Sequence, residues 1–170
     1  MEIVLYPDPV LRRRATELTA FSPELEAKAR AMFDLMYKAK GVGLAAPQVG
    51  ESLQMLVGNP TGDPAHPEQE FVLVNPRIVR RKGNEFGEEG CLSFPGIYAE
   101  VERNRSVVVS CLDRDGKAVE RSFDGFSARI VQHEMDHLTG TLFIDRMSAS
   151  DRIRASARLK ELEERFRKGK

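Results

Sequence analysis

The chain has 170 residues, of which 41% are hydrophobic and 31% charged, and this balance is typical of a single globular domain, residues 1–170. Its 26 basic and 26 acidic residues give a formal net charge of zero, which argues against a nucleic acid or a membrane surface as the main partner. It has no apolar run long enough to cross a bilayer, no recognisable secretory signal, and only two cysteines, too few for a disulfide framework. We therefore expect a protein of a reducing compartment, the cytoplasm, and take it to be a monomer.

The first half of the chain predicts one long helix and several short strands. Ser22 followed by Pro23 is a favourable helix start, and Gly41 is a favourable stop. Apolar residues recur between them at helical spacing. The expected elements are irregular residues 1–21, a helix from 22 to the glycines at 41 and 43, a loop of small residues at 41–48, a strand at 53–57, a surface loop at 59–69, and a strand at 71–74 with an extension at 78–79.

The second half predicts strands followed by two helices. Asp124 is a candidate cap for the first helix, which ends at Gly140, and Ser148 is a candidate cap for the second. The expected elements are a glycine- and acid-rich segment at 83–96, strands at 98–102, 106–112 and 118–123, a hairpin turn at 113–116, a helix after 124, an extended piece at 141–144 and a terminal helix after 148. Strands in the middle, with helices before and after them, predict an α+β fold.

The most informative motif is H-E-x-x-H at residues 133–137, within the first of these two helices. A spacing of four residues places His133 and His137 on one helix face, where both imidazoles can bind one divalent metal ion. Glu134 lies beside them as a candidate base for a water molecule on that ion. Phe126 and Ile130 share the same stripe, so we expect the face that holds the metal to be buried as well.

A catalytic site of this type needs a third protein ligand and one open position. Cys91 is the favoured candidate, because a thiolate is a strong ligand and the glycine before it lets the backbone approach closely. Phe143 stands where a metzincin would have its third histidine. Cys111 lies in a β-branched run and is interpreted as a core residue, whereas His66 is interpreted as a surface residue.

Three segments together resemble the signature motifs of one enzyme family. They are Gly41-Val42-Gly43-Leu44-Ala45-Ala46-Pro47-Gln48, Glu89-Gly90-Cys91-Leu92-Ser93 and Gln132-His133-Glu134-Met135-Asp136-His137. In this order and spacing they are similar to the motifs of peptide deformylases, and the resemblance extends to residues 6–12 and 140–146. No motif position departs from the family pattern.

The resemblance implies both an activity and a set of roles. Peptide deformylases remove the formyl group from the N-terminal methionine of newly made bacterial and organellar proteins and release formate. The implied metal ligands are Cys91, His133 and His137, the implied acid/base is Glu134, and the implied carbonyl-oxygen donors are the side chain of Gln48 and the backbone N–H of Leu92. The implied fold is α+β, with mostly antiparallel or mixed strands around a central H-E-x-x-H helix and a C-terminal helix. The family's usual metal is Fe²⁺, although Zn²⁺, Ni²⁺ or Co²⁺ also suits one thiolate and two imidazoles.

A formyl-methionine substrate needs an unbranched apolar pocket beside the metal. Val42, Phe126 and Ile130 are candidates for its walls, and Gly43 leaves room for a peptide to run along the backbone. Arg129 can line the rim with its aliphatic stem, and we expect its charge to reach water.

The terminal helix is rich in arginine and lysine, and in bacterial members of the family this region is thought to dock on the ribosome. No membrane partner is expected.

Two other interpretations stay open. A zinc endopeptidase would take its third ligand from a downstream carboxylate, for which Glu161, Glu163 and Glu164 are available. A binding protein with a closed structural site would use both cysteines and both motif histidines, leave no position for water and have no need of Glu134.

Overall fold

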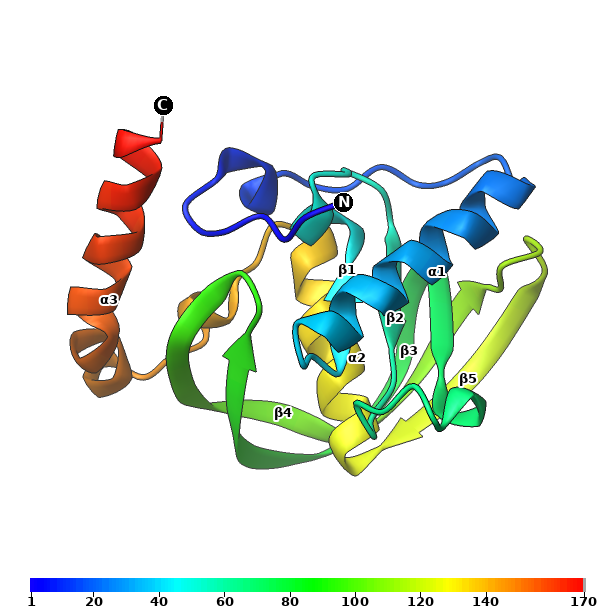
Figure 1. Ribbon diagram of the computed structural model, residues 1–170. Coiled ribbons are helices and arrows are strands. Elements are labelled where there is room, and N and C mark those ends of the chain that lie inside the picture. The colour runs from blue at the N-terminus through cyan, green and yellow to red at the C-terminus, as the bar shows by residue number, and fades with distance from the viewer. Residues whose placement is uncertain (170) are drawn as a thin grey trace.

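The computed structural model describes residues 1–169, so Lys170, the last residue of the expected domain, lies outside the described residues. Five antiparallel strands form one sheet in chain order, and helices pack against it (Figure 1). The strands are β1 (Gly43–Ala45), β2 (Met55–Gly58), β3 (Phe71–Cys91), β4 (Phe94–Leu112) and β5 (Ala118–Asp124), and the α-helices are α1 (Pro23–Lys38), α2 (Gly125–Leu138) and α3 (Ala149–Lys168). The predicted α+β fold, with its C-terminal helix, is confirmed.

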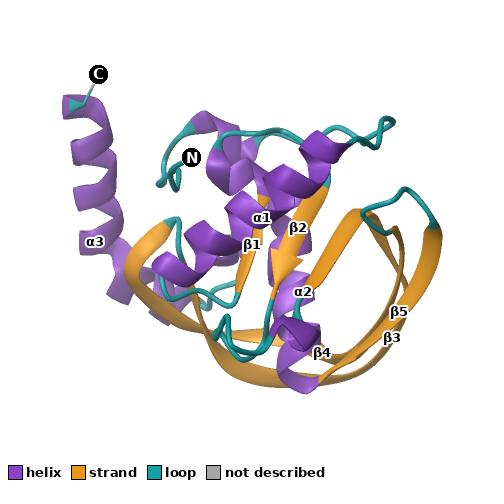
Figure 2. Cartoon of the chain, turned by 45° about the vertical axis from the view of Figure 1, so that its right-hand side comes forward, coloured by secondary structure: helices purple, strands orange, loops and turns teal. Residues whose placement is uncertain are grey.

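The largest difference from the expected elements is the length of β3 and β4. Together they form one long curved hairpin, in which residues 83–91 belong to β3 and the two strands predicted at 98–102 and 106–112 are a single strand (Figure 2). Register shifts interrupt the pairing, including one between Gly90 and Cys91. Irregular pairing of this kind bends a hairpin locally. Residues 83–91, part of the segment rich in glycine and acids, are therefore part of a bent strand.

Helix α2 carries the H-E-x-x-H motif and lies within the curve of the sheet (Figure 2). Ala128, Ile130 and Val131 from this helix are buried in one core cluster with strand residues such as Leu56 and Val109. The predicted buried stripe is correct for Ile130 and for both motif histidines. It is wrong for Phe126, which is 53% exposed because the first turn of α2 extends to the mouth of a cleft.

The N-terminal segment joins two motifs that are far apart in the sequence. The backbone N–H of Val4 donates to the carbonyl of Gln48 at 2.8 Å, and that of Tyr6 donates to the carbonyl of Ser93 at 2.9 Å. Cys91 pairs with Phe94 across the tight turn between β3 and β4, so the cysteine stands at the very end of its strand. The same short segment therefore holds the turn after Cys91 close to the 3₁₀ helix that carries Gln48.

Helix α3 lies at one margin of the molecule, beside the end of the β3–β4 hairpin (Figure 1). Its cap is the one expected, since the Ser148 hydroxyl accepts a hydrogen bond from the backbone N–H of Asp151. Ala155 and Leu162 are buried in a cluster with Phe94, and the rest of the helix is largely exposed. Among residues 1–169, no helix combines the length and the apolar character that a membrane span requires.

Candidate metal centre

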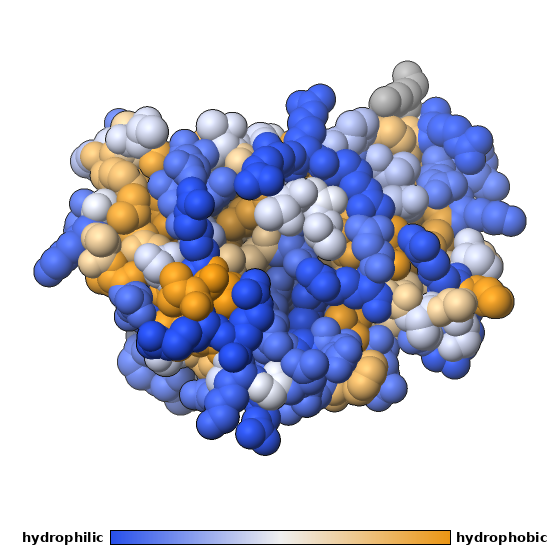
Figure 3. Space-filling view, turned by 180° about the vertical axis from the view of Figure 1, so that it is seen from behind, coloured by the Kyte–Doolittle hydropathy of each residue, from blue (hydrophilic) through white to orange (hydrophobic). Residues whose placement is uncertain are grey.

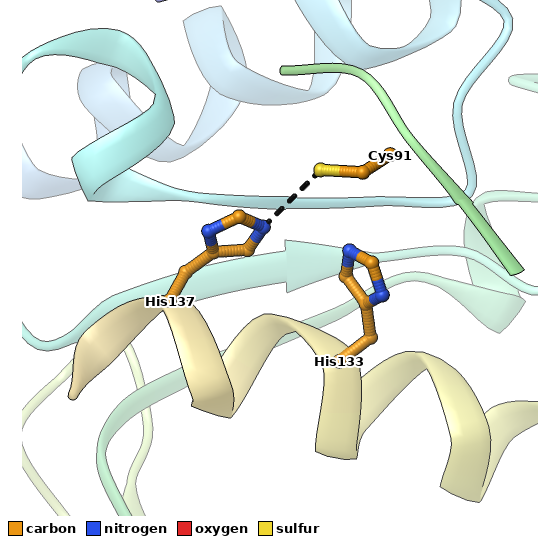
Figure 4. Close-up of side chains that lie close together, drawn as sticks. All are labelled: Cys91, His133 and His137. Atoms are coloured by element: carbon orange, nitrogen blue, oxygen red, sulfur yellow. Dashed lines mark hydrogen bonds between the residues drawn. The ribbon is translucent and has the colours of Figure 1, made fainter. Parts of the chain in front are cut away.

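Cys91, His133 and His137 converge on one point although they come from two elements (Figure 4). Cys91 Sγ lies 3.4 Å from His137 Nε2, and one ligand atom from each of the three residues lies within 4.8 Å of the others. The helical spacing of four brings the histidines to one face, as predicted, and the end of β3 supplies the sulfur. In the described part of the chain, no other histidine, cysteine, aspartate or glutamate belongs to this group.

The residues present fit a divalent cation. Glu134 Oε2, next in the chain to His133, is a buried polar atom for which residues 1–169 offer no hydrogen-bond partner, and such atoms are rare in folded proteins. Burial lowers the pKa of His137 well below its ordinary value, so its imidazole is neutral and its Nε2 lone pair is free to bind a metal. One thiolate and two imidazoles leave a tetrahedral ion one open position for water or substrate.

Glu89 orients the first of the two histidines. Its Oε2 lies 2.8 Å from His133 Nδ1, so the imidazole turns its Nε2 towards Cys91. Burial alone would raise the pKa of Glu89, but the hydrogen bonds from His133 and Arg103 outweigh it and lower the pKa to about 2. Glu89 therefore stays ionised as the outer partner of this ligand.

A charge network continues from Glu89 through Arg103 to Asp136 of α2 and to Arg146. Arg103 donates to both carboxylate oxygens of Glu89, at 2.8 and 3.0 Å, and to Asp136 at 2.6 Å. Arg146 also binds Asp136, through two hydrogen bonds. Sequence reasoning missed this network. The available signal was an acid two residues before the ligand cysteine, because a metal-binding histidine usually donates its second nitrogen to a carboxylate.

Arg129 does not have the role expected of it. Its side chain lines the cleft, but its guanidinium is buried instead of reaching water. It donates to Glu89 at 3.0 Å and to the carbonyls of Val101 and Glu85 at 2.8 and 3.0 Å. Gly87 leaves the space that the guanidinium fills, because a Cβ there would lie 2.9 Å from Arg129 Cζ. The charge therefore supports Glu89 from within the protein.

Glu134 is buried at the inner wall of the cleft, next to Gly43. Burial raises its pKa to about 7, which suits a group that must take up and release a proton near neutrality. A Cβ on Gly43 would lie 2.5 Å from Glu134 Oε1 and 2.8 Å from Ile130 Cγ2. A glycine at position 43 therefore leaves the space that the Glu134 carboxylate occupies. This role adds to the expected one, which is to leave room for a peptide.

We expect Gly43→Ala to impair the site by displacing Glu134. The added methyl overlaps the carboxylate at a distance that real Cβ atoms do not show, so Glu134 must move. Turnover at this centre should fall by roughly 10²-fold, as is typical when a reacting group is misplaced by about 1 Å. Metal content, measured on the same sample, should stay unchanged, since the atoms nearest to the added methyl belong to Glu134 and Ile130 and not to the three candidate ligands. Full activity in Gly43→Ala would show that Glu134 tolerates the shift.

Gln48 is held so that its amide N–H₂ faces the metal centre. Its Oε1 accepts a hydrogen bond from the backbone N–H of Ala45 at 2.8 Å, which leaves Nε2 to donate towards Cys91 Sγ at 3.5 Å and Ser93 Oγ at 3.3 Å. Leu92 follows Cys91 directly in the turn between β3 and β4 and lines the same cleft. Both expected oxygen donors therefore lie beside the three candidate ligands.

A cleft of about 690 Å³ opens beside Cys91 and His133. Its walls contain all five residues expected to contact substrate, namely Val42, Gly43, Phe126, Arg129 and Ile130. Ile130 is buried and Val42 is half-buried, so the inner part of the cleft is apolar, whereas Phe126 stands at its mouth. Tyr98, which is 66% exposed, also lines the cleft and was not predicted.

The alternative ligands lie elsewhere. Glu161 pairs with Arg158 and Arg165 along α3, and Glu163 accepts a hydrogen bond from Tyr6. Cys111 is buried in the core, where burial raises the pKa of its thiol, and it is not part of the ligand cluster. His66 is exposed beside Glu68, as expected. These positions disfavour both the endopeptidase and the closed structural site.

Comparisons with known proteins agree with the motifs. A family model described as polypeptide deformylase matches residues 1–153. The chain is 45% identical over 167 residues to the chloroplastic peptide deformylase 1B of Oryza sativa, covering 98% of this chain and 62% of that protein. It is 43% identical over 161 residues to the peptide deformylase of Acidobacterium capsulatum, covering 95% of this chain and 94% of that protein.

Solved structures give the same result. A crystal structure of peptide deformylase from Plasmodium falciparum matches with a TM-score of 0.95 at 44% identity, covering 98% of this chain and 97% of that one. The peptide deformylase of Thermotoga maritima matches with a TM-score of 0.80 at 41% identity, covering 86% and 97%. The chain spans only about three fifths of the length of the rice and Arabidopsis thaliana relatives, 62% and 61%. The predicted resemblance is confirmed, and the chain belongs to the polypeptide deformylase family.

Proposed function

We propose that this protein is a metal-dependent hydrolase that removes the formyl group from the N-terminal formyl-methionine of nascent polypeptides, with residues 1–170 as one catalytic domain. One observation carries the proposal. Cys91 Sγ and the imidazoles of His133 and His137 meet at the wall of a cleft, beside a buried carboxylate that has an unpartnered oxygen, Glu134 Oε2. This is the arrangement that hydrolysis of an amide at a metal centre requires.

The residues of the cleft have distinct tasks. A divalent cation bound by Cys91, His133 and His137 supplies Lewis-acid chemistry, lowering the pKa of water and polarising a carbonyl. Glu134, with a pKa of about 7, accepts the proton of the attacking water and delivers it to the leaving amine nitrogen. Gln48 Nε2 donates a hydrogen bond to the carbonyl oxygen as that oxygen gains charge. The backbone N–H of Leu92 donates to the same oxygen, and one such donor is typically worth roughly 3–4 kcal/mol in the transition state.

The apolar part of the cleft suits the methionine side chain. Val42 and Ile130 line its inner wall, Phe126 covers its mouth, and Gly43 leaves the backbone open to a peptide running past it. Arg129 belongs to the wall through its stem, while its guanidinium holds Glu89. We therefore assign no charge recognition of the substrate to Arg129.

We propose Fe²⁺ as the metal in the cell, with Zn²⁺, Ni²⁺ or Co²⁺ able to replace it, because thiolate and imidazole ligands bind all four. The test is anaerobic purification followed by elemental analysis. About one iron per chain supports the assignment, and another metal at that stoichiometry under the same conditions overturns it.

The activity is tested on the same anaerobic sample. We expect formate release from formyl-Met-Ala-Ser and no acetate release from acetyl-Met-Ala-Ser, whose larger acyl group crowds the reacting carbon. Chelation should abolish the reaction, and the removed metal ion should restore it. Cleavage of internal peptide bonds without formate release would instead support the endopeptidase.

We propose that α3 brings the enzyme to the ribosome. Its basic residues outnumber its acidic ones, and Arg165, Arg167 and Lys168 gather at its exposed end. Reversing these three charges should abolish co-sedimentation with ribosomes in low salt, because contacts to phosphate are electrostatic, and should leave activity on a free tripeptide intact. A control reversal of Arg13, Arg14 and Lys38, which are also exposed, should leave co-sedimentation unchanged. Equal binding by all the variants would discard the proposal.

We also propose that the protein is a monomer acting in the cytoplasm, where bacteria make formylated chains. The face drawn in Figure 3 is mainly hydrophilic, which favours a monomer. Light scattering and cell fractionation test these two statements.

A further inference from the structure

Asn59 is a completely buried polar residue outside the site described above. Its side-chain oxygen accepts from the backbone N–H and the hydroxyl of Thr61, at 3.0 and 2.7 Å. The two N–H groups of its amide are shared among three acceptors, the carbonyls of Asp63 and His66, at 3.2 and 3.1 Å, and the hydroxyl of Tyr37 at 2.9 Å. One side chain therefore organises the whole loop from residue 59 to 66.

The loop is also fastened to helix α1. The Tyr37 hydroxyl, which accepts from Asn59, donates to Glu70 Oε1 at 2.7 Å, and Arg30 donates to the same oxygen at 2.9 Å. Burial and the hydrogen bond to Glu70 raise the pKa of Tyr37 to about 12, so the phenol keeps its proton. Hydrogen bonds from Asn59 to Tyr37, and from Tyr37 to Glu70, therefore hold the loop against α1. The composition of the loop predicted only that it lies at the surface.

The same loop packs against Val42, a residue of the cleft wall. The backbone N–H of Asn59 donates to the carbonyl of Val42 at 2.8 Å, next to the β1–β2 pairing of Gly43 with Gly58. Gly62 adopts a positive φ of 64°, and a Cβ on it would lie 3.4 Å from Val42 Cγ1. Val42 therefore has the cleft on one side and this loop on the other.

We propose that Asn59 is a positioning residue that sets substrate affinity, by holding the 59–66 loop against Val42 and so fixing the cleft wall formed by residues 41–43. The inference rests on the proposed function of the cleft. The three candidate metal ligands come from the end of β3 and from α2, neither of which contacts Asn59 through the hydrogen bonds described above. Loss of the Asn59 side chain is therefore expected to weaken substrate binding and to leave metal binding and the chemical step unchanged.

The experiment compares Asn59→Ala with the wild-type holoenzyme on formyl-Met-Ala-Ser. We expect KM to rise by about 5- to 10-fold and kcat to stay within about twofold, the signature of an interaction made equally in the ground and transition states. Metal content should be unchanged. Hydrogen exchange should accelerate in peptides that cover residues 59–66 and 41–44, a readout independent of turnover.

Asn75→Ala is the matched control. Asn75 also uses both ends of its amide on backbone groups, accepting from the N–H of Leu18 at 2.9 Å and donating to its carbonyl at 2.8 Å, but it does not line the cleft. We expect this variant to lose stability as well, partly because Asn75 has a positive φ of 50° that alanine adopts less readily, with KM unchanged. Tyr37→Phe, which removes one partner of Asn59 and is the milder change, should raise KM in the same direction by a smaller factor.

The outcomes separate the two proposals. An unchanged KM in Asn59→Ala, or an equal KM rise in Asn75→Ala, overturns the positioning role while leaving the proposed function intact. If Asn59→Ala does not fold, an unchanged KM in Tyr37→Phe overturns it. Failure of the wild-type holoenzyme to release formate overturns the proposed function itself.

Discussion

Replacing Glu134 by glutamine should nearly abolish formate release and leave the metal in place. The amide has the shape of the carboxylate but cannot accept a proton, and general acid–base catalysis typically contributes roughly 10²- to 10⁴-fold to a rate. Glu134 is buried, and no described group forms a hydrogen bond with its Oε2. The measurement is single-turnover formate release under anaerobic conditions, with elemental analysis of each sample.

Glu161→Gln is the control for this prediction. Glu161 is a candidate ligand only if the protein is an endopeptidase, and it pairs with arginines along α3. The deformylase proposal expects normal activity from Glu161→Gln, whereas the endopeptidase expects loss of metal. Activity retained in Glu134→Gln would contradict its role as the acid/base and would favour a site with no need of this carboxylate.

Replacing Cys91 by alanine should release the metal. The ion would keep two imidazoles and lose its charged sulfur ligand, so its affinity should fall by more than the roughly 10- to 100-fold typical of losing an outer hydrogen-bond partner. Dialysed Cys91→Ala should contain far less than one metal ion per chain and should release no measurable formate. Competition with a chelator of known affinity measures the change.

Cys111→Ala is the matched variant for this second prediction. Cys111 is the other cysteine, buried among apolar side chains of the core. Its replacement should cost about 1 kcal/mol of unfolding free energy, measured with denaturant, and leave metal content unchanged. Metal loss in Cys111→Ala equal to that in Cys91→Ala would instead support a closed four-ligand site.

The sequence predicted the two histidine ligands of the candidate metal centre because that information is local. Four residues of helix make slightly more than one turn, so His133 and His137 must share a face wherever the helix lies. The order of the three motifs then indicated Cys91 as the third ligand, and the structure places the three together. Gln48 and Leu92 followed from the same motifs, and both lie beside the cluster.

Only the tertiary structure decided how this centre is supported. Glu89 and Arg103 are 14 residues apart and Arg103 and Asp136 are 33 apart, so no periodicity in the sequence indicates that they form one network. The exposure of Phe126, the burial of the Arg129 guanidinium and the support of Val42 by the Asn59 loop also depend on which elements come to lie opposite each other. Periodicity reports the neighbours of a residue within its own element, whereas partners across the core are set by how a curved hairpin closes around a helix.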